Sequence, residues 1–315
     1  MPSHRFRFRS AIAALAAALA IVAGTRDAAA QACCAGSGAV TPGRLALHES
    51  ALVGTQLKAG AVFGSFDSAG RYVPAPPGAS ELDFEEDLFG AVRVLDRVQV
   101  ALVVPLVETS RTAGGLSEFG GGLGDVNLSV RYDPTLAGAS RVVPGVAVLA
   151  GLTVPTGKPA DAPGLGDLAT GATGIGAYQF SIGAAVEQSF GPWLVGATAL
   201  VAQRTARTAG AGALSGPERL GPQWSFLAAC AYAFPNDAAL AASAGYSIEG
   251  DATIAGVGTA GTARRLPTLT VGGTYPLGDL WRLQAALFDN PPIGQLGLNQ
   301  PAGAGVLATG VRSWL

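Results

Sequence analysis

The chain has little charge and few of the residues that most enzymes use for chemistry. Of its 315 residues, 2 are histidine, 3 are cysteine and 13% are charged. Soluble domains carry about 25% charged residues, so this composition is unusually apolar for a protein that folds in water. The mean hydropathy of +0.36 indicates the same. The composition therefore favours a chain that meets lipid or buries a very large core.

Long hydrophobic runs are also missing, although a helix that crosses a membrane needs about 20 apolar residues. The longest apolar run, Ala11–Ala23, follows a basic start and precedes the small residues Ala28–Ala30. This layout predicts a signal peptide over residues 1–30. The 45 glycines and 20 prolines disfavour helix elsewhere. Two classes remain, a soluble all-β domain and a membrane barrel that spreads its apolar surface over many strands.

The scarcity of histidine and cysteine limits catalysis and metal binding. After the leader His48 is the single histidine, and it precedes the first predicted strand, so no Ser–His enzyme and no cofactor are expected. Adjacent cysteines rarely bridge each other, which leaves three interpretations of Cys33-Cys34. They are a lipidated Cys33, a metal site with His48 and Glu49, or an unspecialised linker. Cys230 lies on an apolar strand face and is interpreted as a small hydrophobe.

Alternation of apolar and polar residues is the strongest pattern in the chain, and it is typical of strands. In Gly124–Asp133, for example, Val126 and Leu128 share one face and Asp125 and Asn127 the other. The pattern predicts twelve strands. They cover residues 50–66, 81–95, 98–112, 123–133, 141–154, 174–190, 193–205, 222–234, 238–250, 265–277, 280–290 and 305–315.

The connections between these strands alternate between short and long. Asp96-Arg97, Gly191-Pro192, Pro235–Asp237 and Gly278-Asp279 have the composition of tight turns, whereas the loops between them run to about 10 to 20 residues. Short periplasmic turns and long outer loops are the layout of bacterial outer-membrane barrels. The fold class predicted is all-β, an antiparallel transmembrane β-barrel of about 12 strands. A secreted β-sandwich is the remote alternative.

The predicted domain order is a signal peptide (1–30), an N-terminal periplasmic segment (31–49) and a transmembrane β-barrel (50–315) in the bacterial outer membrane. An even number of strands places both termini of the barrel chain on the periplasmic side. Without its leader the chain is mildly acidic and has no basic run, so nucleic acid is not an expected partner.

Charged side chains should point into the barrel, because an Arg or Lys that faces lipid costs roughly 2–4 kcal/mol at the midplane. They would form either a salt-bridge network that holds a narrow barrel or the lining of a pore. The candidate lumen-lining residues are Lys58, Asp83, Glu85, Asp87, Arg93, Asp125, Asn127, Arg131, Glu187, Arg204, Glu249 and Arg282. The acidic run Glu81–Asp87 could select or bind cations, or form a solvated or Arg-paired rim.

Many inward positions carry glycine or alanine, among them Gly145, Gly151, Gly183, Gly196 and Gly245. Barrels of eight strands are just filled by side chains, and wider barrels leave room. Twelve strands with small inward residues should therefore leave a passage unless a loop folds in. A barrel with a plugged lumen and a structural or binding role is the main alternative.

Four segments together carry a resemblance to a known family. They are Gly122–Val126 with Arg131-Tyr132, Val154–Lys158, Gly174–Ser181 and Gly191–Trp193. The chain resembles the outer-membrane transporter-like family named for the meta-pathway of phenol degradation, which is distantly similar to long-chain fatty-acid and aromatic-hydrocarbon transporters. The resemblance implies passage of small, hydrophobic or aromatic molecules. The implied partners are outer-membrane lipid, a small-molecule solute and the barrel assembly machinery.

Two features depart from that pattern. After the predicted signal peptide, only about 20 residues precede the first strand, so no folded hatch is expected. The chain ends Ser313-Trp314-Leu315 rather than in an aromatic residue, although Leu307, Val311 and Leu315 keep an apolar alternation.

Overall fold

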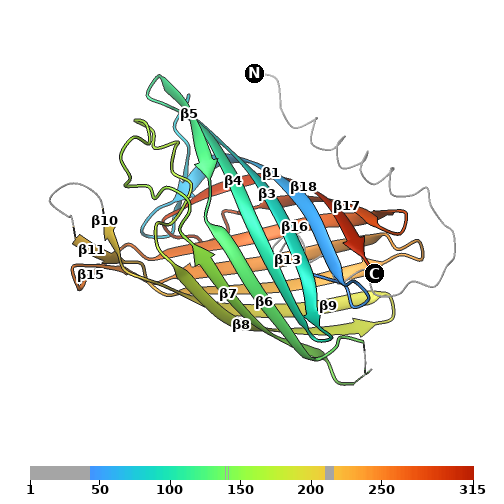
Figure 1. Cartoon of the computed structure of the whole chain (residues 1–315). Helices are drawn as coiled ribbons and strands as arrows, with labels where there is room; N and C mark the ends of the chain where they lie inside the picture. Colours follow the sequence, from blue (N-terminus) through green and yellow to red (C-terminus); the bar gives the residue numbers. More distant parts are fainter. Residues whose placement is uncertain (1–42, 139, 141, 210–215) are drawn as a thin grey trace, which may run out of the picture.

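A computed structural model describes residues 43–138, 140, 142–209 and 216–315. Its main sheet closes into an antiparallel barrel of 12 strands, which confirms the predicted fold class (Figure 1). The barrel strands are β1 (Ala51–Phe66), β3 (Ser80–Leu95), β4 (Val98–Ala113), β6 (Val126–Thr135), β7 (Gly145–Val154), β8 (Gln179–Phe190), β9 (Trp193–Arg204), β12 (Gln223–Ala233), β13 (Ala239–Glu249), β16 (Arg264–Leu277), β17 (Trp281–Asp289) and β18 (Gln300–Trp314).

The first and last strands close the barrel. β1 pairs with β18 from Ala51↔Trp314 to Phe66↔Gln300, with one irregularity between Val62 and Gly64. Closure satisfies the backbone N–H and C=O groups of every wall strand, which a sheet needs if it is to lie in lipid. Among the described residues, no helix is long and apolar enough to cross a membrane.

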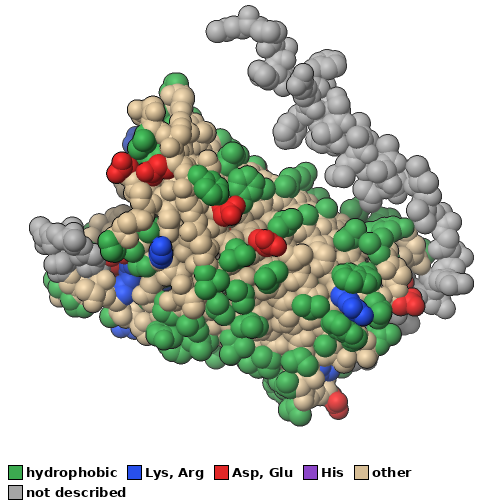
Figure 2. Space-filling model, turned by 45° about the horizontal axis from the view of Figure 1, so that its top comes forward, with side chains coloured by type: hydrophobic (Ala, Val, Ile, Leu, Met, Phe, Trp, Pro, Cys, Tyr) green, Lys and Arg blue, Asp and Glu red, His purple; other side chains and the backbone are tan. Residues whose placement is uncertain are grey.

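The two faces of each strand differ as the alternation predicts. On β8, Phe180 and Ile182 point outward and are 56% and 59% exposed, whereas Ala185 and Glu187 are buried inside. Figure 2 shows hydrophobic side chains spread over the outer wall of the barrel. An apolar belt on the outside of a closed barrel is the surface that lipid requires, so the β-sandwich alternative is wrong.

One end of the barrel has tight turns and the other has long loops, also as predicted (Figure 1). Gly191 and Gly278 adopt positive φ values of 58° and 73° in two of the tight turns, a conformation that glycine tolerates best. The loops contain short strands that the sequence analysis did not predict. They are β2 (Tyr72–Pro74), β5 (Leu116–Leu123), β10 (Arg207–Ala209), β11 (Gly216–Arg219), β14 (Ala252–Ile254) and β15 (Val257–Thr259).

These additions extend the outer end beyond the wall. β5 pairs only with the outer half of β4, so the β4–β5 hairpin projects from the rim (Figure 1). β10, β11, β14 and β15 form a separate small sheet. Arg207 of β10 pairs with Glu218 of β11 at 2.8 Å and links the sheet to the loop 155–178 through an ion pair to Asp161 at 2.7 Å. The outer end is therefore a structured rim.

Candidate functional site: the barrel lumen

The inner wall encloses a cavity of about 290 Å³. Four leucines from different strands, Leu149, Leu200, Leu227 and Leu266, form much of the apolar part of its lining. Hydroxyl groups surround them. The hydroxyl residues are Ser129, Thr198, Ser225, Ser243, Ser247, Thr268 and Thr270. The cavity thus combines an apolar patch with many neutral hydrogen-bonding groups, and the charged residues Arg44, Arg131 and Glu187 also line it.

One side of this cavity meets the start of residues 43–50, here called the N-terminal segment. Gly43 and Arg44 line the cavity. Leu45, Ala46 and Glu49 are 5%, 2% and 2% exposed. The sequence analysis placed residues 31–49 before the barrel and expected no plug, but this part of them packs inside the barrel wall. The lumen is therefore narrowed at the end of the barrel that carries the tight turns.

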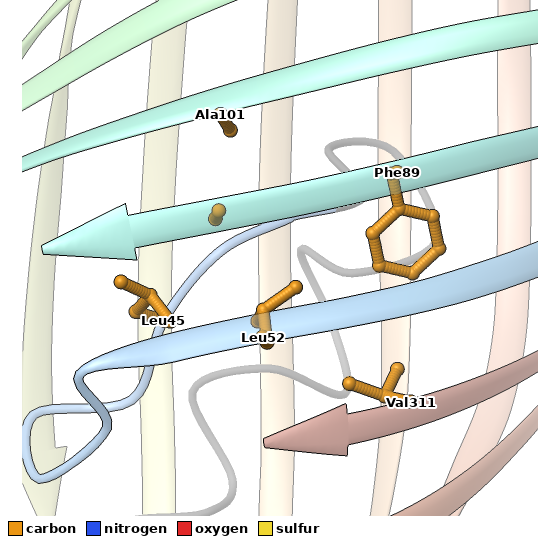
Figure 3. Close-up of a cluster of buried hydrophobic side chains, with 6 residues drawn as sticks. Leu45, Leu52, Phe89, Ala101 and Val311 are labelled. Atoms are coloured by element: carbon orange, nitrogen blue, oxygen red, sulfur yellow. The ribbon is translucent and has the colours of Figure 1, made fainter. Parts of the chain in front are cut away.

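Apolar contacts hold the N-terminal segment against β1, β3, β4 and β18. Figure 3 shows Leu45 next to Leu52, with Phe89, Ala101 and Val311 on the surrounding strands. All five side chains are buried. Because the barrel interior is otherwise rich in small and polar residues, this cluster is a local apolar core at the end of the barrel with the tight turns.

Two arginines among the predicted lumen residues bind the N-terminal segment. Arg93 donates from Nη2 to the carbonyl of Ala46 at 2.7 Å and from Nε to the carbonyl of Glu49 at 3.0 Å. Arg282 forms an ion pair with the buried carboxylate of Glu49 at 2.7 Å. These inward charges therefore anchor a segment of the chain.

Glu187 is the centre of an ion network beside this segment. Its carboxylate pairs with Arg44 and, at 3.5 Å, with Arg131. Arg131 also pairs with Asp133 at 2.8 Å. The side chains are 14% exposed or less. A buried network of this kind depends on every partner, because a lone buried charge is costly.

The acidic run lies along β3, with Glu81, Asp83, Glu85 and Asp87 on the inward face and Glu86 on the outer wall. Three of the inward carboxylates have partners. Lys58 pairs with Glu85 at 3.0 Å, Thr109 donates to Asp83 at 3.0 Å, and Arg111 pairs with Glu81 at 2.8 Å. Within the described part of the chain, Asp87 makes no hydrogen bond or ion pair. This side of the inner wall is strongly acidic.

The remaining predicted residues lie toward the outer end. Arg204 and Glu249 form an ion pair at 2.7 Å, and Asn127 donates to Thr153 at 3.0 Å. Asp125 does not line the lumen as predicted. It lies between β5 and β6 and accepts hydrogen bonds from the amides of Gly157 at 2.9 Å and Ile175 at 2.6 Å. It fixes the outer loop 155–178, which is why β8 begins at Gln179 and not at residue 174.

The proposed cysteine sites gain no support. Cys33 and Cys34 lie outside the described residues, and His48 is exposed at the barrel end. Among the residues that the structure describes, no three His, Cys, Asp or Glu side chains gather closely enough to hold a metal ion.

No family model matches the chain, and no curated protein matches its sequence. Solved structures do match its fold. The COG4313 outer membrane channel from Pseudomonas putida F1 is 18% identical with a TM-score of 0.70, over 87% of this chain and 100% of that chain.

Two further matches have a TM-score of 0.51. The translocator domain of the autotransporter NalP from Neisseria meningitidis is 11% identical over 97% of this chain and 98% of that chain. The β domain of the Bordetella autotransporter BrkA is 10% identical over 84% of this chain and 100% of that chain. At these identities the likeness concerns the fold, and the chain has the fold of outer-membrane β-barrels.

Proposed function

We propose that the chain is an outer-membrane channel or transporter of a Gram-negative bacterium that passes small molecules. The observation that carries the proposal is the cavity of about 290 Å³ inside a closed barrel whose outside is apolar. The likeness to a solved outer membrane channel supports it. The partners are then outer-membrane lipid, the solute and the barrel assembly machinery that inserts such barrels.

The lining favours small hydrophobic or aromatic solutes that also carry a hydroxyl group. Leu149, Leu200 and Leu227 offer an apolar surface, and the seven hydroxyl residues around them offer hydrogen bonds. An apolar cavity of about 150 Å³ holds benzene, so the volume here is sufficient for a single substituted ring. The chemistry of the lining thus fits a phenol or an aromatic alcohol.

The first experiment is single-channel conductance of the refolded mature chain in a planar bilayer. A water-filled pore gives discrete ohmic steps, with the inward charges of β3 acting on the permeating ions. A folded barrel that stays silent contradicts the open pore, with folding checked by its heat-modifiable mobility in electrophoresis.

A binding barrel with a plugged lumen is the second candidate, and the buried N-terminal segment favours it. Vesicles that contain the protein separate the two functions. If the protein is a transporter, vesicles that contain it take up phenol or benzyl alcohol faster than vesicles without protein. A plugged binding barrel binds the same alcohols in solution but leaves the rate of vesicle uptake unchanged.

A further inference from the structure

Arg312 lies on the outer wall of the barrel, at the periplasmic end of β18. Its register partners are Trp281 on β17 and Val53 on β1, both of which face outward. The other outward residues on the periplasmic halves of β16, β17, β18 and β1 are uncharged. Arg312 is thus a single cation on an apolar part of the wall.

Two indole rings hold this cation in place. The guanidinium carbon lies 5.0 Å from the ring centroid of Trp314 and 5.7 Å from that of Trp281. Contacts of this length between a cation and an aromatic face are favourable, and more so away from water. The rings therefore fix the guanidinium on the outer wall although it could extend toward water.

The guanidinium lacks an acceptor. Its Nε is buried without a hydrogen-bond partner, and no carboxylate of the described residues lies within ion-pair distance of Arg312. A guanidinium has five N–H donors in a fixed plane. Donors that are removed from water without a partner are costly, so an anion from outside the chain would complete this site.

Space for such a ligand lies next to the guanidinium. Gly310 is the next outward residue along β18, and a Cβ built on it would come no closer than 4.0 Å to Leu283. The surface there is shallow and apolar, which suits an acyl chain. A phosphate near Arg312 would meet the guanidinium beside two tryptophan side chains, a residue type that favours the wet boundary of a membrane.

We propose that Arg312, Trp281 and Trp314 bind the phosphate of a phospholipid in the periplasmic leaflet. A guanidinium can bind a phosphate through two parallel hydrogen bonds, whereas an ammonium binds it as a point charge. The assignment of leaflet rests on the proposed outer-membrane function, since the first residue of β1 and the last residue of β18 then lie on the periplasmic side. Lipid binding and conductance are separate measurements, so the lipid site and the proposed channel function can each be contradicted independently of the other.

The test is native mass spectrometry of the detergent-solubilised mature chain with added phosphatidylglycerol. Diacylglycerol with the same acyl chains is the control ligand, because it has no phosphate. The wild type should retain phosphatidylglycerol and not diacylglycerol. R312Q should bind phosphatidylglycerol at least about tenfold more weakly, because charge-assisted hydrogen bonds are lost. R312K should bind with intermediate strength. R97Q removes an exposed cation from a turn at the same end and should leave binding unchanged.

Three results would overturn the proposal. They are equal retention of the two lipids by the wild type, unchanged binding by R312Q, and an equal loss in R97Q. If R312Q fails to fold, the double variant W281F/W314F tests the same site with Arg312 present. Unchanged phosphatidylglycerol binding by that double variant would also overturn the proposal.

Discussion

At the scale of single residues, we expect the loss of Glu187 to have the largest effect on the position of the N-terminal segment. Glu187 connects Arg44 of the N-terminal segment with Arg131 of the wall, in a place where all three side chains are buried or nearly so. Removal of one partner from a buried ion pair costs about 3 kcal/mol or more. The segment therefore depends on this carboxylate for its position.

We predict that E187Q releases the N-terminal segment and raises channel conductance. About 3 kcal/mol corresponds to about a hundredfold larger population of the released state. Single-channel recordings measure the change as open probability. E249Q removes a carboxylate from the Arg204 pair at the other end and should conduct like the wild type. Equal conductance in E187Q and the wild type would contradict this account of the segment.

Asp67 controls a loop outside the membrane-spanning part. The hydrogen bond from the Arg71 amide, at 2.8 Å, is the main cause that lowers the pKa of Asp67 below 3.8. A lowered folded pKa means that the carboxylate stabilises the loop at pH values above 3.8 and that this stabilisation is lost as the pH falls through the lowered pKa.

We therefore predict that hydrogen exchange at the amides of Ala69 and Arg71 is slow near pH 5. Corrected for its intrinsic pH dependence, the exchange should become faster only below pH 3.8. D67N should exchange fast at both pH values. Protection that persists in D67N would show that the carboxylate does not hold these amides.

At the scale of elements, aspartates next to the strand ends fix the outer loops. Asp125 binds two amides of the loop 155–178, and Asp251 binds the amides of Thr262 and Ala263 in the same manner. Hydrogen bonds to charged groups contribute about 1.5–3 kcal/mol each. The loops at the mouth are thus held by a few defined contacts.

We predict that D125A loosens the loop 155–178 and leaves the barrel intact. Loss of two charged hydrogen bonds should raise hydrogen exchange in peptides of this loop about tenfold or more. D251A provides the matched control, because it should affect the loop 250–263 instead. Faster exchange throughout the barrel of D125A would show that Asp125 stabilises the wall itself.

The sequence predicted the wall well and the segments inside or above it poorly. In β8 the alternation identified both faces, because strand side chains point to opposite sides at every step. Residues 43–50 have no such period, and their partners are distant, as in the bond from the Leu45 amide to Gln99 across 54 positions. Strands of three or four residues, such as β10 and β11, are too short to show a period.

Asp125 illustrates the same limit for the site. The alternation placed it on the inward face of a strand. A bend before β6 instead turns its carboxylate to the loop, and Gly124 donates there to the carbonyl of Pro105 at 2.8 Å. The bend and the loop that Asp125 binds come from tertiary structure, which a local pattern does not contain.

At the scale of the whole molecule, the inner wall is electrostatically asymmetric. β3 presents four carboxylates to the lumen, whereas the cavity on the opposite side is lined largely by leucine, serine and threonine. A unit charge about 10 Å from an ion in water changes its energy by about 0.4 kcal/mol, which is about a factor of two in occupancy. Cations should therefore concentrate along β3.

We predict that D83N together with D87N lowers the cation-to-anion permeability ratio about fourfold, a factor of about two for each charge. Reversal potentials under a potassium chloride gradient measure this ratio. E86Q removes a neighbouring carboxylate from the outward face of the same strand and should leave the reversal potential unchanged. An equal shift of the reversal potential in E86Q would show that the effect comes from the overall charge of the protein.

The pairing of β1 with β18, which closes the barrel, also determines when the sheet edges are covered during folding. Ser50 at the start of the barrel binds the carbonyl of Trp314, 264 positions later. Contacts between such distant residues form slowly, and until the last strand arrives both the first strand and the newest one expose unpaired edges. The chain therefore stays prone to aggregation until β18 has paired with β1, and a chain that lacks its final strand cannot close the barrel.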